Sequence, residues 1–506
     1  MHSSRLPCDG EQVAVFSETA SAWVIGQVDW PVHHDLVTVK YMVGNAHCRK
    51  HLHPDSEHMR LLRSHRTACS ESDTEMEEFD PAAVQFQGDR DDVVPPGYDA
   101  KDFYTSHRKL QELLDNNDVA LIDGEWLLTY SCTPGNKLPM RQDLPPDALV
   151  NPDTLFKSWH EDAPKEKRIR IVSLSHCWWT QDHPDPDGWQ LRFLAPFIDA
   201  FLKDMQKEGA PTFAFYCSWC SQWQKKGGAR SPEHAESWER AVKFMDLWYT
   251  HIYTRVWILP HVPNDAENPR PYKERGWPTW ESACSLFLGG VKALDLSLFD
   301  KQRARKKLPK AYKVSWRVVT EWCRCRVTVP LEPDEFDQEI AQKVFTQGQI
   351  DRDKVKNNYR QTYYRAISVV DRLYFSQAGS FDHLPWTSDD VDKLIKVLSL
   401  CSPNLDRLNL DFCKVASPDV ERIAKELSRF KELKDISLIL CDILDPAAMA
   451  IAKAVEALPG LCKLRLQIDQ VSDRVRENLT ASCAKQALFQ EKPRNEYVLA
   501  FKRPKE

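Results

Sequence analysis

The sequence predicts a multidomain chain made of a small β-barrel, a central α/β domain on a parallel sheet, and a C-terminal α/β solenoid of repeats. Three observations support this prediction. Short runs of alternating polarity follow one another from residue 10 to 62, strands alternate with helices from residue 171 to 290, and an apolar motif recurs every 28 residues after residue 400. At roughly 150 residues per domain, a chain of 506 residues has room for several such parts.

The first 66 residues contain five short strand-like runs separated by Gly, Asp, Pro and Asn, which is the pattern of a small all-β domain. They resemble SH3-like and Tudor-like barrels, which bind peptides or, through an aromatic cage, methylated lysine. The cage candidates are Phe16, Trp23, Trp30 and Tyr41, since aromatic faces attract cations. The alternative is that these rings fill the core of the barrel, because a fold does not imply a ligand.

Residues 67–97 are predicted to be an acidic linker. Nine acidic residues and one basic residue lie between Glu71 and Asp92, and few apolar residues accompany them. Such a composition cannot bury enough apolar surface to form a core of its own.

A central α/β domain with a helical extension is predicted over residues 98–365. It begins with a helix near residues 103–117 and continues with either a β-hairpin or a first strand near residues 120–130. Strands are then expected in the runs IVSLSHCWW, TFAFYCSWCSQW and TRVWILP, with helices after each. Strands that alternate with helices indicate a parallel sheet, and ligands bind beyond the carboxyl ends of its strands. Those ends follow Ser173, Tyr216 and Leu259.

The C-terminal part, residues 366–506, repeats itself. Leu405-x-x-Leu408-x-Leu410 recurs at Leu433 and at Leu461, and a weaker first copy starts at Val370. The amphipathic helices between the copies start with Ser-Pro or Asp-Pro, which predicts side-chain caps followed by Pro in the first turn. The repeats resemble leucine-rich repeats of the long type. That resemblance implies a short solenoid whose face binds a protein partner.

Four blocks of the central domain carry a further resemblance. LSHCWW, FAFYCSWCSQ, IYTRVWILP and RGWPTWE occur in this order over roughly residues 165–290. They resemble the blocks of the heterokaryon-incompatibility (HET) domain, a distant relative of TIR domains. The resemblance implies a role in signalling or self-recognition, with self-association through this domain. The second block departs from the family, because Phe215-Tyr216 stands where family members usually carry an acidic residue.

The last block points to a catalytic residue. TIR domains that hydrolyse NAD use a glutamate four residues after a tryptophan, and Glu281 follows Trp277 at that distance. The resemblance implies that Glu281 is catalytic, and that the residues around the bound NAD are Ser175, His176, Trp178, Tyr216 and Trp277. A carboxylate beside the ribose can stabilise the oxocarbenium-like transition state. The alternative is a structural Glu281, stabilised by the helix dipole or paired with Arg275.

Composition excludes several other classes of function. The net charge of −6 and the lack of a stacking-aromatic array disfavour nucleic acid as a partner, and no apolar run has the length of a membrane span. No residue cluster has the spacing of a metal site, and no resident cofactor is implied. The 15 scattered cysteines favour reduced thiols. Cys217-x-x-Cys220 has redox or zinc spacing, but without a matching second pair we favour two buried thiols.

Two functions from different classes remain. The first is a signalling, self-recognition or immunity-type protein whose HET/TIR-like domain hydrolyses NAD as its substrate, in the cytoplasm or else in the nucleus. The second is a scaffold without catalysis that binds proteins through its barrel and repeats. The Trp277/Glu281 spacing favours the enzyme, and Phe215-Tyr216 favours the scaffold.

Overall fold

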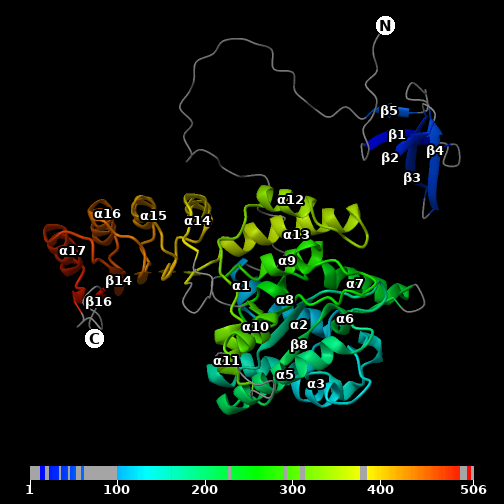
Figure 1. Ribbon diagram of the computed structural model, residues 1–506, viewed down its shortest axis with the longest axis horizontal. Coiled ribbons are helices and arrows are strands. Elements are labelled where there is room, and N and C mark those ends of the chain that lie inside the picture. The colour runs from blue at the N-terminus through cyan, green and yellow to red at the C-terminus, as the bar shows by residue number, and fades with distance from the viewer. Residues whose placement is uncertain are drawn as a thin grey trace, which may run out of the picture. The chain divides into compact units, whose positions relative to one another are not determined.

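The computed structural model describes residues 12–17, 22–33, 36–43, 46–52, 59–61, 100–160, 162–225, 229–288, 293–307, 314–376, 384–490 and 498–502 (Figure 1). The chain divides into two compact units, Met1–Gln85 and Phe86–Glu506. The fold is mixed α/β, and two of its three sheets are rich in parallel strands. The predicted linker at residues 67–97 lies outside the described residues.

The N-terminal unit contains one five-stranded antiparallel sheet. Its strands are β1 (Gln12–Ser17), β2 (Ala22–His33), β3 (Leu36–Val43), β4 (Ala46–Leu52) and β5 (Met59–Leu61), in the order β4-β3-β2-β1-β5. The register of β2 shifts between Asp29 and His33, where Pro31 cannot donate to the ladder. Closure into a barrel stays a prediction. The proposed cage at Phe16, Trp23, Trp30 and Tyr41 concerns side chains outside the described part.

The second unit opens differently from the prediction. The expected first helix is two short helices, α1 (Ala100–Thr105) and α2 (Arg108–Asp115). Of the two alternatives for residues 120–130, the β-hairpin was wrong, and the first strand is present only as β6 (Ile122–Asp123), with α3 (Gly124–Ser131) after it. The Asp123 side chain accepts hydrogen bonds from the amides of Glu125 and Trp126. That N-cap starts a helix in a run whose apolar residues also suit a strand.

The central sheet has the order β10-β9-β7-β8-β6, and only β6 is antiparallel to its neighbour. Its other strands are β7 (Ile171–His176), β8 (Ala214–Tyr216), β9 (Thr254–Leu259) and β10 (Ala293–Asp295). Along β9, Val256 faces one hydrophobic core and Trp257 faces the other. Both faces of the sheet are therefore covered, as parallel strands require.

Helices form a layer on each face of this sheet (Figure 1). One core includes residues from α1, α2, α4 (Pro152–Trp159), α7 (Pro232–Lys243), α8 (Leu247–Thr250) and α9 (Gly276–Cys284). The other includes residues from α3, α5 (Trp189–Glu208), α6 (Ser218–Ser221), α10 (Ser297–Arg305) and α11 (Trp316–Trp322). Four 3-10 turns complete this part: η1 (Arg141–Asp143), η2 (Pro146–Ala148), η3 (Lys165–Lys167) and η4 (Tyr272–Glu274).

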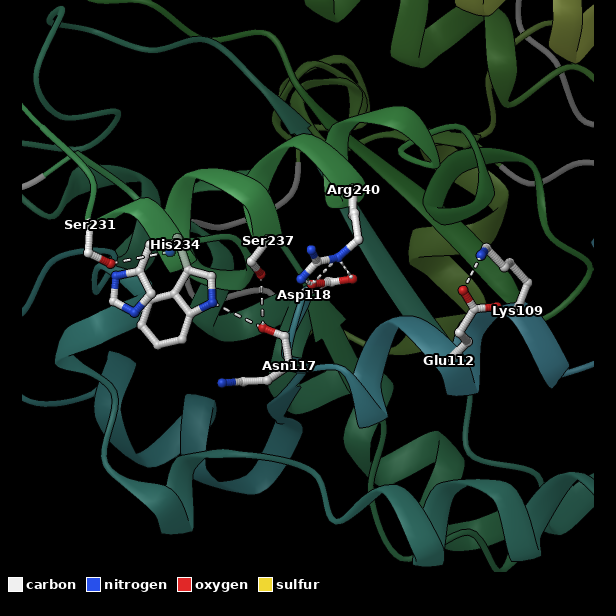
Figure 2. A network of polar contacts seen from close by, with 9 residues as sticks. Lys109, Glu112, Asn117, Asp118, Ser231, His234, Ser237 and Arg240 are labelled. Carbon is white, nitrogen blue, oxygen red and sulfur yellow. Dashed lines mark hydrogen bonds and ion pairs between the residues drawn. The ribbon is translucent and has the colours of Figure 1, made fainter. Parts of the chain in front are cut away.

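The turn between α2 and β6 is held by α7 (Figure 2). The guanidinium of Arg240 forms a bidentate ion pair with the buried carboxylate of Asp118, with N–O distances of 2.8 to 3.1 Å. Asn117 has a left-handed backbone, and its carbonyl accepts hydrogen bonds from Trp223 and Ser237. This polar network joins two segments that are more than 100 residues apart in the sequence.

Helices α12 (Pro333–Ala341) and α13 (Gln349–Ile367) lie over α9 (Figure 1). The start of α9 is held by the segment between them, because the amide of Gly276 donates to the carbonyl of Val344 at 3.0 Å. A Cβ atom on Gly276 would lie 2.0 Å from the ring of Phe345. This position therefore has no room for a side chain.

Replacing Gly276 by Ala is expected to destabilise the second unit by about 1 to 3 kcal/mol, the usual cost of overpacking a core. Denaturant unfolding followed by tryptophan fluorescence measures the loss. The same substitution in a Phe345→Ala background should cost clearly less, because the clashing ring is gone. Equal costs in the two backgrounds would contradict the close approach of Gly276 and Phe345.

The third sheet has the order β11-β12-β13-β14-β16-β15, and its first four strands are parallel. The strands are β11 (Arg372–Tyr374), β12 (Arg407–Asn409), β13 (Asp435–Leu438), β14 (Lys463–Gln467), β15 (Phe489–Gln490) and β16 (Val498–Lys502). Leu408 pairs with Ile436, which pairs with Leu464. The 28-residue spacing thus places equivalent residues of β12, β13 and β14 side by side in the sheet. Strand β11 belongs to the weaker first copy of the motif.

Four helices accompany these strands in a row (Figure 1): α14 (Ser388–Leu400), α15 (Ser417–Leu427), α16 (Asp445–Glu456) and α17 (Asp473–Lys485). The predicted caps were wrong for α15 and α16, where neither Ser417 nor Asp445 bonds its own helix. Ser417 instead accepts from the amide of Leu444, and Asp445 accepts from the amide of Ser472. Each side chain joins its repeat to the next.

Among the described residues, no helix combines the length and the apolar character that crossing a bilayer needs.

Candidate active site

A buried hydrogen-bonded cluster lies where the central strand β7 meets helix α9. Ser173 and Ser175 point to the same side of β7 as α8 and α9, since alternate residues of a strand share a face. The Ser173 hydroxyl donates to the carbonyl of Trp248. The Ser175 hydroxyl lies 2.5 Å from Oε2 of Glu281 and 2.6 Å from the hydroxyl of Tyr272. Ser175 and Glu281 are therefore brought together, although 106 residues separate them.

The hydroxyl groups of Ser175 and Tyr272 form a short hydrogen-bonded chain that ends at Glu281. The Ser175 hydroxyl donates to Oε2 of Glu281 at 2.5 Å, which uses the only hydrogen that Ser175 has. The Tyr272 hydroxyl donates to the carbonyl of Pro278 at 3.0 Å and lies 2.6 Å from the Ser175 hydroxyl. The hydrogen bond from Ser175 therefore favours the ionised form of Glu281.

Burial and hydrogen bonding act on the pKa of Glu281 in opposite directions. Burial raises it to about 7, against smaller lowering effects of the Ser175 hydrogen bond, the His176 charge and the Tyr249 hydrogen bond. The side chain is 7% exposed. The alternative pairing with Arg275 is absent, because the guanidinium of Arg275 donates to the carbonyls of Arg270, Trp178 and Asn268.

Tyr216, at the end of β8, lies in the same buried region. Its ring stacks on Trp248 at 4.9 Å, and its hydroxyl accepts from the Gln222 amide at 2.8 Å. Burial, with the nearby charge of Glu281, holds the pKa of Tyr216 well above its usual range. At neutral pH this residue is a hydroxyl and an aromatic wall, and it carries no charge.

The two predicted tryptophans contact other parts of the domain. The half-buried Trp277 packs edge-on against Trp280 at 5.8 Å and against Phe345 at 6.4 Å. The half-buried Trp178 packs edge-on against Trp219 at 5.3 Å. Trp277 therefore lies next to Phe345, in the segment between α12 and α13, and Trp178 lies beside α6. None of these ring contacts involves Ser175 or Glu281.

His176 is the neighbour of Ser175 in β7, but its contacts are different. Its Nδ1 lies 2.6 Å from Oε1 of Gln190 and its Nε2 lies 3.5 Å from Sγ of Cys217. Burial by itself lowers the pKa of His176, but the Cys217 charge and the hydrogen bonds with Cys217 and Gln190 outweigh it and raise this pKa to about 9. The charge of His176 reaches Glu281 and lowers its pKa.

Two members of the cluster were missed at the sequence level, Tyr249 and Tyr272. Both are buried, and burial raises the pKa of both phenols. Tyr249 comes from α8 and Tyr272 from η4. Neither tyrosine is part of a sequence motif with a recognisable spacing. The only available signal for Tyr272 was its closeness to the RGWPTWE block. The complete cluster holds one carboxyl among the hydroxyls of two serines and three tyrosines, which is a setting for acid–base or electrostatic chemistry.

The stability of the fold should fall as pH rises from about 4.5 to 7, because folded Glu281 keeps a proton that the unfolded chain loses. A pKa near 7 against an ordinary 4.5 corresponds to about 3 kcal/mol. Glu281→Gln is neutral at every pH and its amide oxygen can accept from Ser175, so its unfolding free energy should exceed that of the unmodified protein by an amount that grows with pH across this window. Unfolding free energies of both proteins at pH 5 and 8 measure this, and parallel pH profiles would contradict it.

Two further observations complete the description of candidate sites. No group of three His, Cys, Asp or Glu side chains in the described part of the chain is arranged to hold a metal ion. A hollow of about 300 Å³ lies over loops that follow β12, β13 and β14, and its lining includes Lys414, Leu440, Asp442 and Asp469.

Comparisons with family models, with curated proteins and with solved structures found no match to this chain. The resemblances to HET, TIR, SH3-like, Tudor-like and leucine-rich-repeat proteins therefore rest on the sequence blocks alone.

Proposed function

We propose that this chain is a signalling protein whose HET/TIR-like α/β domain hydrolyses the nicotinamide–ribose bond of NAD through Glu281. The observation that carries the proposal is the contact between Glu281 and Ser175 at the carboxyl end of the central strand. That is the edge of a parallel sheet at which ligands bind. The aromatic side chains of Tyr216, Tyr249 and Tyr272 surround this contact and supply walls for a flat ring system.

The chemistry requires Glu281 in its ionised form. As nicotinamide leaves, positive charge develops on the ribose, and a carboxylate in a low-dielectric site stabilises that charge. With a pKa of about 7, roughly half of the carboxyl groups are ionised at neutral pH. Ser175 orients the carboxyl group through its hydrogen bond. Water then completes the hydrolysis at the ribose carbon.

NAD reaches Glu281 only if the cover of the cluster opens, since Glu281 is 7% exposed. We propose self-association as the opening step, because TIR-like enzymes, which the sequence blocks resemble, act as assemblies. Tyr272 of η4 contacts Ser175, and Val344 holds the start of α9, so we propose that η4 and the start of α9 move in this step. Free thiols throughout the described part support a cytoplasmic location, where thiols stay reduced.

The test is nicotinamide release from NAD by the purified full chain, measured at dilute concentration and under crowding. The proposal expects release that increases with self-association. Absence of release in the assembled state would overturn it, provided that assembly is verified by light scattering.

A non-catalytic scaffold is the second candidate, and one observation favours it. Glu281 is buried and hydrogen-bonded to Ser175, which is also what a purely structural carboxyl requires. In this function the third sheet is a leucine-rich-repeat-like solenoid that binds a protein at the hollow beside Leu440. The N-terminal sheet is a barrel with a peptide or methyl-lysine ligand. Specific capture of a partner that Leu440→Glu abolishes, without NAD hydrolysis, would select the scaffold.

A further inference from the structure

Cys217 and Cys220 lie together at the carboxyl end of β8, outside the Glu281 cluster. Cys217 directly follows the strand and precedes α6, and Cys220 lies in that short helix. The two thiols are hydrogen-bonded to each other, and both are buried. A Cys-x-x-Cys pair within one helical turn has the spacing of redox-active dithiols.

The hydrogen bonds of Gln190 determine the tautomer of neutral His176, and so whether the nitrogen that faces Cys217 carries a hydrogen. The Gln190 amide nitrogen donates to the carbonyls of Cys177 and Pro184, at 2.8 Å each. Its Oε1 must therefore face Nδ1 of His176, 2.6 Å away, so Nδ1 carries the hydrogen. In neutral His176, Nε2 is then an acceptor, and it lies 3.5 Å from the sulfur of Cys217.

The position of Gln190 is fixed by Asp185. The backbone amides of Gln190 and Leu191 donate to the buried carboxylate of Asp185, at 2.8 and 3.1 Å. Gln190 is fully buried at the start of α5. A base with a fixed tautomer beside a thiol is the geometry that activates a cysteine nucleophile.

The charges in the pair follow from these contacts. Burial alone raises the pKa of Cys217, but the Cys220 hydrogen bond and the His176 charge outweigh it and hold this pKa well below its usual range. The pKa of Cys220 is raised by burial and by Cys217. The favoured state is a Cys217 thiolate beside a His176 imidazolium, with Cys220 as a thiol.

We propose that Cys217 and Cys220 form a redox-active dithiol that hydroperoxides oxidise to a disulfide, with His176 as the base that activates Cys217. The Cys217 sulfur attacks the peroxide, the O–O bond breaks, and His176 gives its proton to the leaving oxygen, which departs as water from hydrogen peroxide. The Cys220 sulfur then attacks the Cys217 sulfenic acid, the S–S bond forms, and the hydroxyl leaves as water with the Cys220 proton. Two thiols lose two electrons in total, and one peroxide gains them.

Other cysteines of the second unit provide internal controls. Burial raises the pKa of Cys325 and of Cys441 to about 12. Neither pKa responds to a histidine, and such thiols are chemically inert. Cys132 is exposed, and its removal by Cys132→Ser excludes disulfides that it forms between molecules.

The experiment treats the full-length Cys132→Ser protein with hydrogen peroxide, blocks remaining thiols after denaturation, and maps the peptides by mass spectrometry. We expect the Cys217–Cys220 peptide to lose two hydrogens at least about tenfold faster than Cys325 or Cys441 is modified. In a Cys220→Ser variant, Cys217 should instead be trapped as a sulfenic acid by dimedone. Both thiols remaining free, or reacting no faster than Cys325 and Cys441, would overturn the proposal.

The role of His176 has its own readout, the pH dependence of Cys217 alkylation in the reduced protein. Gln190→Leu removes the group that fixes the tautomer and leaves both thiols in place. We expect the alkylation profile to move to higher pH in this variant. An unchanged profile in a folded variant would exclude activation of Cys217 through His176.

Discussion

Replacing Glu281 by Gln is expected to lower nicotinamide release from NAD by about 100- to 1,000-fold, the usual cost of removing one preorganised electrostatic group from an active site. The amide has nearly the same shape and its oxygen can still accept the hydrogen bond from Ser175, so the buried cluster persists while the negative charge is lost. Glu339→Gln on α12 is the matched control, because Glu339 is a partly exposed glutamate that pairs with Lys343 outside the candidate site. It should keep full activity.

The pH dependence of the reaction gives a second readout of Glu281. Its pKa of about 7 means that the ionised form, which stabilises the ribose cation, increases as pH rises through 7. Release by the unmodified protein should therefore rise between pH 6 and 8 and then level off, and the residual rate of Glu281→Gln should lack this limb. Equal rates for both proteins would assign Glu281 a structural role.

Replacing Arg365 by Met is expected to destabilise the second unit by about 3 to 5 kcal/mol, because it leaves a buried carboxylate without its cation. Asp246 lies at the start of α8, where it accepts a hydrogen bond from Tyr104 at 2.7 Å and lies 3.7 Å from Arg365. Both charged side chains are about nine-tenths buried or more. The three residues join α1, α8 and α13, and α8 also carries Tyr249 of the candidate site.

The cost should depend on pH in a defined direction. Burial already raises the pKa of Asp246, and Arg365 opposes that rise, so the variant raises it further. Folded Asp246 then keeps a proton that the unfolded chain loses, and the variant loses stability as pH rises. Urea unfolding at pH 5 and pH 8 should show the larger deficit at pH 8.

Arg360→Met is the matched control for this experiment, because Arg360 lies on the same helix and its ion pairs with Asp334 and Asp337 are partly exposed. Exposed ion pairs contribute about 0 to 1 kcal/mol. A deficit for Arg365→Met no larger than that of the control would show that Asp246 tolerates the loss of its cation.

Much of the architecture follows from local patterns. The period of 28 residues reappears as the register that aligns Leu408, Ile436 and Leu464, because each repeat buries its apolar positions only by stacking on the next. The runs at 171–176 and 254–259 form parallel strands as expected, since each has apolar residues on both faces. The hairpin alternative failed near residue 124, where a cap at Asp123 outweighs strand propensity. The strand expected over residues 212–223 was also too long, because β8 ends at Tyr216 and α6 follows it.

Only some residues of the candidate site could be predicted from the sequence. Glu281 follows from its spacing to Trp277, but Trp277 contacts Phe345 and Trp280, which no spacing could indicate. Tyr249 and Tyr272 come from different elements and meet Glu281 only after the chain has folded. The same holds for Cys217, since its partner His176 lies 41 residues away on a neighbouring strand.

The sequence by itself determined the order of the parts, the parallel strands and the repeat register, because these depend on which residues are apolar and at what period. Only the tertiary structure decided the pKa shifts of Glu281 and Cys217. A pKa depends on burial and on charges that approach through space, and neither quantity is a property of residues that are adjacent in the chain. The same reason explains why Ser417 and Asp445 join successive repeats when their positions alone indicate helix caps.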